Sequence, residues 1–248
     1  MFRHRASEEI DLKTLIDWFL LSFLAGNINT GGYLACQRFV SHVTGFATLA
    51  GVDAAVELWW EALGILTVPA FFLLGVLISA YYVDRRIHEG KKPRYALVMG
   101  FATLCLVLAG AGGVAGLWGE FGHELEITRD YAFLALLCMA SGLQNAALSS
   151  SSGSTLRTTH LTGTTTDLGI GLMRWATLAE KDSRRGTEMK GNFLRIGLIF
   201  SFMVGSGIGA VLFIKYQYWG FALPIAIAGY ATYKANRRAA GDQLTANV

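Results

Sequence analysis

The sequence is poor in charged residues and cysteine, and each deficit argues against a class of protein. Asp, Glu, Lys and Arg make up 16% of the 248 residues, whereas soluble domains contain about 25%. This deficit excludes intrinsic disorder and a coiled coil, and it argues against a soluble enzyme. The three cysteines (Cys36, Cys105 and Cys138) lack metal-ligand or Cys-x-x-Cys spacing, so we expect small core residues rather than a disulfide scaffold. A net charge of +3 is too small to predict a nucleic-acid partner.

Hydrophobic residues and glycine are abundant instead. Hydrophobic side chains make up 53% of the chain, and there are 29 glycines but only 3 prolines. The mean hydropathy is +0.41. This combination is typical of helices packed closely in a bilayer, where small residues allow backbones to approach. The sequence therefore predicts an all-α integral membrane protein with membrane lipid as its surroundings.

Six segments are apolar and long enough, or nearly so, to cross a bilayer. A hydrocarbon core about 30 Å thick needs roughly 20 apolar residues in a helix. The expected spans are residues 15–35, 63–83, 95–117, 131–149, 193–213 and 218–233. Asp17 is expected at the membrane interface, at the beginning of the first span.

Basic residues predict the orientation of these spans. The N-terminal tail, the connections after the second and fourth spans and the C-terminal tail together hold 17 Lys and Arg residues. The other three connections hold one each, namely Arg38, Arg129 and Lys215. Because cytoplasmic loops are enriched in Lys and Arg, both termini are predicted to lie in the cytoplasm.

The chain contains an internal repeat. Residues 41–51 (SHVTGFATLAG) and 159–169 (THLTGTTTDLG) are identical at five of eleven positions. The similarity continues outward, pairing residues 26–29 with 142–145 and residues 75–80 with 205–210. We therefore expect two halves, residues 1–125 and 126–248, each with three spans, within one membrane domain.

Three spans per half require the halves to enter the membrane from opposite sides. The first repeated motif lies in a connection with one basic residue and the second in a connection with six, which agrees with a 3+3 inverted-topology repeat. This architecture recurs in secondary transporters that work by alternating access. The sequence thus favours a transporter for a small anion or polar metabolite, with a channel of inverted-repeat architecture as the alternative.

Each repeated motif precedes a further helix-compatible stretch, residues 44–62 and 162–179. Thr followed by Gly is typical of a helix start, where a hydroxyl can cap free backbone N–H groups. The two stretches are expected either to re-enter the membrane or to lie at its interface. If they re-enter, their N-termini would suit an anionic or strongly hydrogen-bonding solute.

Candidate site residues follow from the duplication. The substrate-binding candidates are Asn29, Thr44, Gly45, Gln144, Asn145, Thr162 and Gly163. The candidates for gating or proton coupling are His42, His160, Asp167 and Arg174, because histidine and intramembrane charge commonly serve these roles. Asp167 and Arg174 are two helical turns apart, so they share a helix face without touching. Two histidines are too few ligands for a metal site, and no cofactor is expected.

An enzyme is a remote alternative. The run Ser149-Ser150-Ser151-Ser152-Gly153-Ser154, followed by His160 and Asp167, resembles the parts of a serine hydrolase. The sequence has no G-x-S-x-G elbow, and serine-rich runs are ordinarily connections. No catalytic residue is therefore predicted.

The motifs Gly142-Leu143-Gln144-Asn145, Thr159-His160-Leu161-Thr162-Gly163 and His42-x-Thr44-Gly45 carry a family resemblance. With them the chain resembles the YoaK-type family of small bacterial membrane proteins, which is recorded as a domain of unknown function. The resemblance spans both halves. It implies a multi-pass protein of the bacterial inner membrane with about six spans, supplies no substrate, and leaves a homodimer as one possible assembly.

Overall fold

The computed structural model describes residues 11–123, 127–152 and 157–244. Within these ranges the chain is helical, without a β-strand. The elements are α1 (Leu12–Cys36), α2 (Val43–Ala55), α3 (Trp59–Ser79), the π-helix η1 (Ala80–Asp84), α4 (Arg85–His88), α5 (Tyr95–Val114), α6 (Ile127–Ser151), α7 (Leu161–Thr177), α8 (Ser183–Tyr216), the 3₁₀-helix η2 (Gln217–Phe221) and α9 (Ala222–Leu244).

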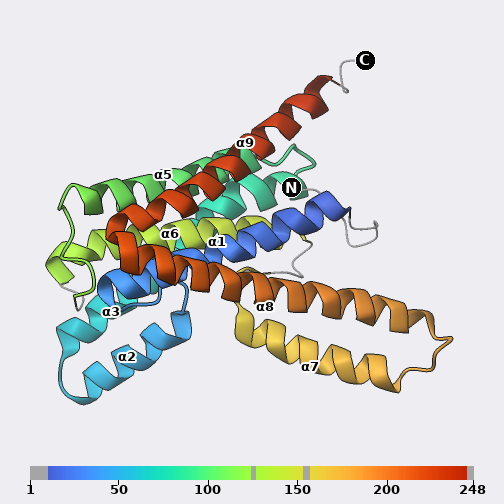
Figure 1. The fold of residues 1–248 in the computed structure, drawn as a ribbon, viewed down its shortest axis with the longest axis horizontal. Coiled ribbons are helices and arrows are strands. Elements are labelled where there is room, and N and C mark those ends of the chain that lie inside the picture. The colour runs from blue at the N-terminus through green and yellow to red at the C-terminus, as the bar shows by residue number, and fades with distance from the viewer. Residues whose placement is uncertain (1–10, 124–126, 153–156, 245–248) are drawn as a thin grey trace.

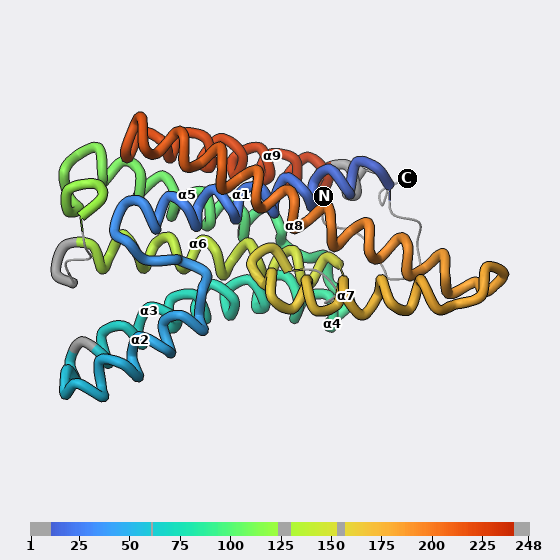
Figure 2. Tube along the Cα trace, turned by 60° about the horizontal axis from the view of Figure 1, so that its bottom comes forward, coloured from blue at the N-terminus to red at the C-terminus, as the bar shows by residue number. Residues whose placement is uncertain are grey.

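The long helices lie side by side along the longest axis of the molecule (Figure 1). In this bundle α1 packs on α8, α3 packs on α6, and α5 contacts both α6 and α9. The shorter helices α2 and α7 pack on α3 and α8 respectively. Figure 2 shows the α7–α8 hairpin extending beyond the other helices at one end of the bundle.

Four helical segments are long and apolar enough to cross a membrane: residues 62–88, 95–114, 130–151 and 183–240. The last of these contains α8, η2 and most of α9. The all-α class and the membrane-type composition are thereby confirmed, whereas the count of six spans stays a prediction. The expected third span ends earlier than predicted, because α5 stops at Val114 and Gly116 adopts a left-handed φ of +74°, as glycine does after a helix end.

The predicted helical stretch 44–62 is wrong at its far end, because α2 ends at Ala55. There Glu57 has a left-handed φ of +65°, and the Leu58 N–H donates to the Asp53 carbonyl at 2.9 Å. These features reverse the chain, so Trp59 begins α3 instead of closing α2. The second predicted stretch, 162–179, agrees with α7 to within two residues.

Two glycines allow α1 and α8 to cross closely. A Cβ built on Gly26 of α1 would overlap the Phe202 carbonyl oxygen of α8. Reciprocally, a Cβ built on Gly205 of α8 would overlap the Phe23 carbonyl oxygen of α1. Close backbone approach at small residues is the usual way membrane helices associate.

The α3 and α6 helices also cross closely at a pair of glycines. A Cβ on Gly142 of α6 would overlap the Phe72 carbonyl oxygen, and a Cβ on Gly75 of α3 would overlap the Met139 carbonyl oxygen. Gly142 and Gly75 are the residues that the repeat alignment pairs with Gly26 and Gly205. The two crossings are therefore built from equivalent glycines.

Candidate functional site

The two repeated motifs each begin a short helix in the same way. His42 is the N-cap residue of α2, and His160 is the N-cap residue of α7, with closely similar backbone angles. A Cβ on Gly45 would lie 3.0 Å from the His42 Nδ1, and a Cβ on Gly163 would overlap the His160 ring. Each histidine ring thus lies against the glycine of its own motif, which explains why glycine occupies that position.

The predicted capping role of the threonine hydroxyls is wrong. Each helix begins one residue before Thr44 or Thr162, and neither N-cap histidine makes a side-chain capping hydrogen bond. Instead, the carbonyls of Thr44 and Thr162 accept hydrogen bonds from Thr48 and Thr166 one turn later, both at 3.0 Å. Thr44 and Thr162 are themselves exposed in this chain.

Asn29 and Asn145 hold the segments that lead into the two short helices. The Asn29 Oδ1 accepts hydrogen bonds from the Ser41 N–H at 3.4 Å and the Ser41 hydroxyl at 3.2 Å. The Asn145 Oδ1 accepts the same pair of bonds from Thr158, at 2.9 and 3.2 Å. Each asparagine therefore joins its long helix to the start of the adjacent motif.

Gln144 lies at the junction of α6 and α1. Its side chain is 1% exposed, and its Nε2 donates to the Leu21 carbonyl at 2.5 Å. Asn27, beside Asn29, is fully buried, and its Nδ2 donates to the Gly205 carbonyl of α8 at 3.3 Å. These amides connect helices of the two halves.

The two motif regions lie on different short helices that diverge. Figure 1 shows α2 and α7 beginning near the middle of the molecule and running toward opposite ends. The first motif borders a pocket of about 130 Å³. This pocket is lined by Gln37, Arg38, Phe39, His42, Gly45, Phe46 and Leu49.

Asp167 and Arg174 both lie exposed on α7. The Arg174 Nη1 lies 3.6 Å from the Glu188 Oε1 of α8. Arg174 thus helps to join α7 to α8, an ion pair that sequence reasoning did not find because its partner lies across a turn.

Asp17 is buried inside the protein where α1 meets α9, and its expected place at the membrane interface stays a prediction. Its side chain is 1% exposed, and its Oδ1 lies 2.5 Å from the Lys234 Nζ of α9. The Arg238 Nη2 is 3.9 Å from its second oxygen. Because a buried charge is very costly unless it is paired, this contact explains how α1 can carry a carboxylate there.

A second buried carboxylate lies near the start of α6. Asp130 is 4% exposed, and its Oδ1 accepts a hydrogen bond from the Gly119 N–H at 2.8 Å. The Tyr218 hydroxyl donates to the Gly119 carbonyl, also at 2.8 Å. These contacts fix the connection between α5 and α6 against η2.

The described part of the serine run lies at the end of α6. The Ser151 and Ser152 hydroxyls donate to the Leu148 and Ser149 carbonyls of their own helix, at 2.8 and 3.1 Å. Gly153 and Ser154 lie outside the described residues. These local bonds are the ordinary behaviour of serine at a helix end.

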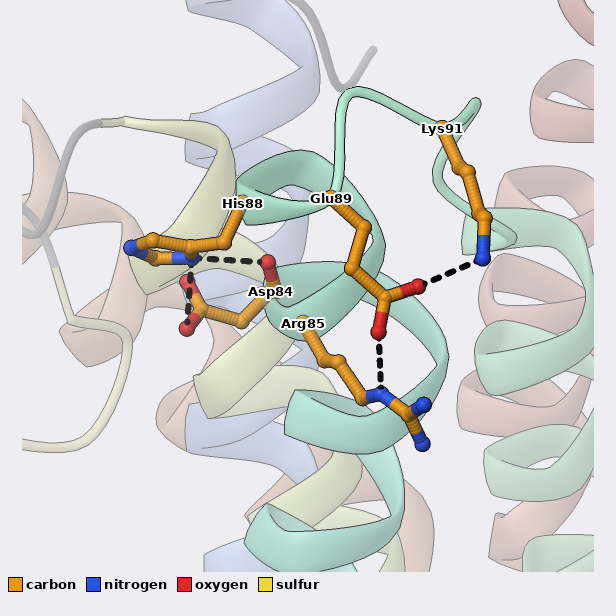
Figure 3. Close-up of polar contacts among 5 residues, drawn as sticks. All are labelled: Asp84, Arg85, His88, Glu89 and Lys91. Atoms are coloured by element: carbon orange, nitrogen blue, oxygen red, sulfur yellow. Dashed lines mark hydrogen bonds and ion pairs between the residues drawn. The ribbon is translucent and has the colours of Figure 1, made fainter.

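The basic connection after α3 carries an exposed network of charges, which Figure 3 shows. The Glu89 carboxylate pairs with Lys91 at 2.8 Å and with Arg85 at 2.6 Å. Hydrogen bonds from these two cations lower the pKa of Glu89 to about 2. Nearby, the His88 Nδ1 lies 3.5 Å from the Asp84 carboxylate, so this turn is a solvated charged loop.

Comparisons with known proteins give a family without an assigned activity. Neither a curated protein nor a solved structure matches the chain. A family model described as "Protein of unknown function (DUF1275)" matches residues 18–233. The match covers all the helices that carry the two motifs, and the family includes the YoaK-type proteins that the motifs resemble. The chain belongs to the DUF1275 family.

Proposed function

We propose that this protein is a secondary transporter that carries a small anion or polar metabolite across the bacterial inner membrane. The observation that carries the proposal is the arrangement of α2 and α7. They begin with the same motif near the middle of the molecule and run toward opposite ends (Figure 1). Paired half-helices of this kind occur in inverted-repeat carriers, where their N-termini face a central substrate.

The matched contacts of the two halves support an inverted repeat. The Asn29–Ser41 and Asn145–Thr158 hydrogen bonds are equivalent, as are the glycine contacts at the α1–α8 and α3–α6 crossings. Residues 1–125 and 126–248 would then form halves of opposite orientation. Both termini would lie on the same side of the membrane, since α1 begins and α9 ends at the same end of the bundle (Figure 1). The distribution of basic residues would make this side the cytoplasm.

The substrate would bind between the starts of α2 and α7. In this proposal the exposed residues Thr44 and Thr162 and the backbone at Gly45 and Gly163 contact the solute. Asn29 and Asn145, with Gln144 at the α6–α1 junction, position these segments. His42, His160, Asp167 and Arg174 would gate the site or couple it to protons, and relative movement of the halves would expose it to each side in turn.

Counterflow in proteoliposomes tests this function. Vesicles containing the protein are loaded with unlabelled inorganic phosphate or a short-chain carboxylate, and uptake of the same labelled anion is measured. A carrier is expected to show saturable uptake that increases when the vesicle interior contains unlabelled anion. Uptake without this trans-stimulation would favour a channel. Absence of uptake for both inorganic phosphate and the carboxylate would contradict the proposal.

The same assay tests the coupling role of histidine. His160→Ala is expected to change the pH dependence of transport, because it removes the imidazole that this proposal assigns to proton coupling. The matched control is His88→Ala, since His88 is exposed in the charged connection after α3. An identical pH profile in the His160 variant and the wild type would remove the coupling role while leaving the carrier proposal intact.

A further inference from the structure

The α7–α8 hairpin contains a polar cluster that the sequence motifs do not include. Asn192 of α8 is 4% exposed, and its Oδ1 accepts a hydrogen bond from the Arg195 Nη1 at 2.8 Å. A Cβ on Gly171 of α7 would overlap the Asn192 Oδ1 and approach the Arg195 Nη1. The two side chains therefore lie directly against the α7 backbone, in space that only glycine leaves open.

The groups that this cluster leaves available are hydrogen-bond donors. An arginine guanidinium carries only hydrogen-bond donors, so Asn192 must turn its carbonyl oxygen toward Arg195. The amide nitrogen of Asn192 then points elsewhere. It is buried, and within the part of the chain that the structure describes it has no hydrogen-bond partner.

The charge of Arg195 is also uncompensated within the described residues. On this hairpin Arg174 pairs with Glu188, Arg184 with Asp182 and Arg185 with Glu180. These three ion pairs account for the carboxylates of residues 178–190.

Arg195 comes after these paired residues on α8, inside the expected span 193–213. Among the described residues of α7 and α8, it forms no ion pair. The Asp167 carboxylate is one turn before Gly171 on α7, but it is exposed and forms no such pair either. Ionisable residues at membrane depth usually face a partner, a path or a bound group.

The corresponding place in the first half is apolar. The repeat alignment that pairs Gly75 with Gly205 also pairs Ala62 with Asn192 and Ile65 with Arg195. Between α2 and α3 lies a pocket of about 330 Å³, lined by residues that include Ala50, Ala62 and Leu66. The α2–α3 pair thus packs with small apolar side chains at these positions. Packing of α7 on α8 therefore does not by itself explain the hydrogen-bond donors of Asn192 and Arg195.

We propose that Asn192 and Arg195 form a binding site for an oxyanion, with the Asn192 amide nitrogen and the Arg195 guanidinium as its donors. A phosphate group has the required acceptors, whether it belongs to a phospholipid headgroup or is free in solution. The site lies where α8 packs on Gly171 of α7 and does not depend on the carrier proposal.

Two binding measurements on the full-length protein distinguish the sources of the anion. In detergent, titration with inorganic phosphate measures the free anion. In nanodiscs, retention of phosphatidylglycerol against phosphatidylcholine measures the anionic lipid. Arg195→Gln and Asn192→Leu are each expected to weaken the binding seen in one of these arms by about tenfold or more, because each removes a donor to an ionised acceptor.

Arg184→Gln is the matched control. It makes the same charge change on the same hairpin, but Arg184 already pairs with Asp182 at 2.7 Å, so anion binding should be unchanged. Thermal unfolding without ligand shows whether Arg195→Gln is simply unstable. If it is, Arg195→Lys takes its place, because lysine keeps the charge but lacks the guanidinium fork. The proposal would be overturned if the Arg195 variants bound both probes as tightly as the wild-type protein does. It would also be overturned if the wild-type protein bound neither probe.

Discussion

Replacing Lys234 by methionine is expected to lower the free energy of unfolding by about 3–5 kcal/mol, because it takes the ammonium group away from a buried carboxylate. Asp17 is 1% exposed and lies 2.5 Å from the Lys234 Nζ. Arg238, at 3.9 Å, is a more distant cation that offsets part of the loss. Methionine preserves the apolar length of the side chain, so the change reports on charge. Chemical unfolding in detergent, followed by tryptophan fluorescence, measures the effect.

The partner variant provides the control. Asp17→Asn should cost less, because the Lys234 side chain is 23% exposed and can extend its ammonium group toward water. The double variant Asp17→Asn with Lys234→Met should recover much of the stability, since a pair removed together leaves no uncompensated charge. Losses that simply add in the double variant would show that the two residues are not coupled.

Gly205→Ala is the second large effect that we expect, a destabilisation of about 1–3 kcal/mol. The added methyl group would overlap the Phe23 carbonyl oxygen, and a backbone atom cannot move aside as a flexible side chain can. The α1 and α8 helices would have to separate at their crossing. The measurement is the same chemical unfolding in detergent, compared with the wild type.

Gly207→Ala is a matched control two residues further along α8. A Cβ at Gly207 meets no atom within 4 Å, so alanine should stabilise the helix by about 0.5–1 kcal/mol through reduced backbone entropy. Gly75→Ala, at the equivalent crossing of α3 and α6, should behave like Gly205→Ala. Similar stability of the Gly205 and Gly207 variants would contradict a close crossing at Gly205.

Local patterns in the sequence predicted much of this fold. Hydrophobic runs located the long helices, and the repeated His-x-Thr-Gly motif located the starts of α2 and α7 to within two residues. These features depend on neighbouring residues, because a span needs a continuous apolar run and a helix start is a local change of backbone. Asn29 and Asn145 were selected for the same reason, as members of duplicated segments.

Contacts between segments far apart in the sequence could not be predicted from local patterns. The partner of Asp17 is 217 residues away, and no local pattern marks Lys234 as its neighbour. The end of α2 depended on one residue, Glu57, whose left-handed conformation is unusual for a non-glycine residue. Arg195 was hidden within an apolar run, although a single charge inside an expected span is itself a signal that could have selected it.

The most direct test of the opposite orientation of the two halves uses equivalent connections. Val56, between α2 and α3, and Lys181, between α7 and α8, are both exposed. The three native cysteines are buried and can be replaced first, after which Val56→Cys and Lys181→Cys are labelled separately with a membrane-impermeant maleimide in intact cells and in inverted membrane vesicles. We predict that position 56 reacts only in intact cells and position 181 only in inverted vesicles. Reaction of both positions from the same compartment would contradict the inverted repeat and the carrier built on it.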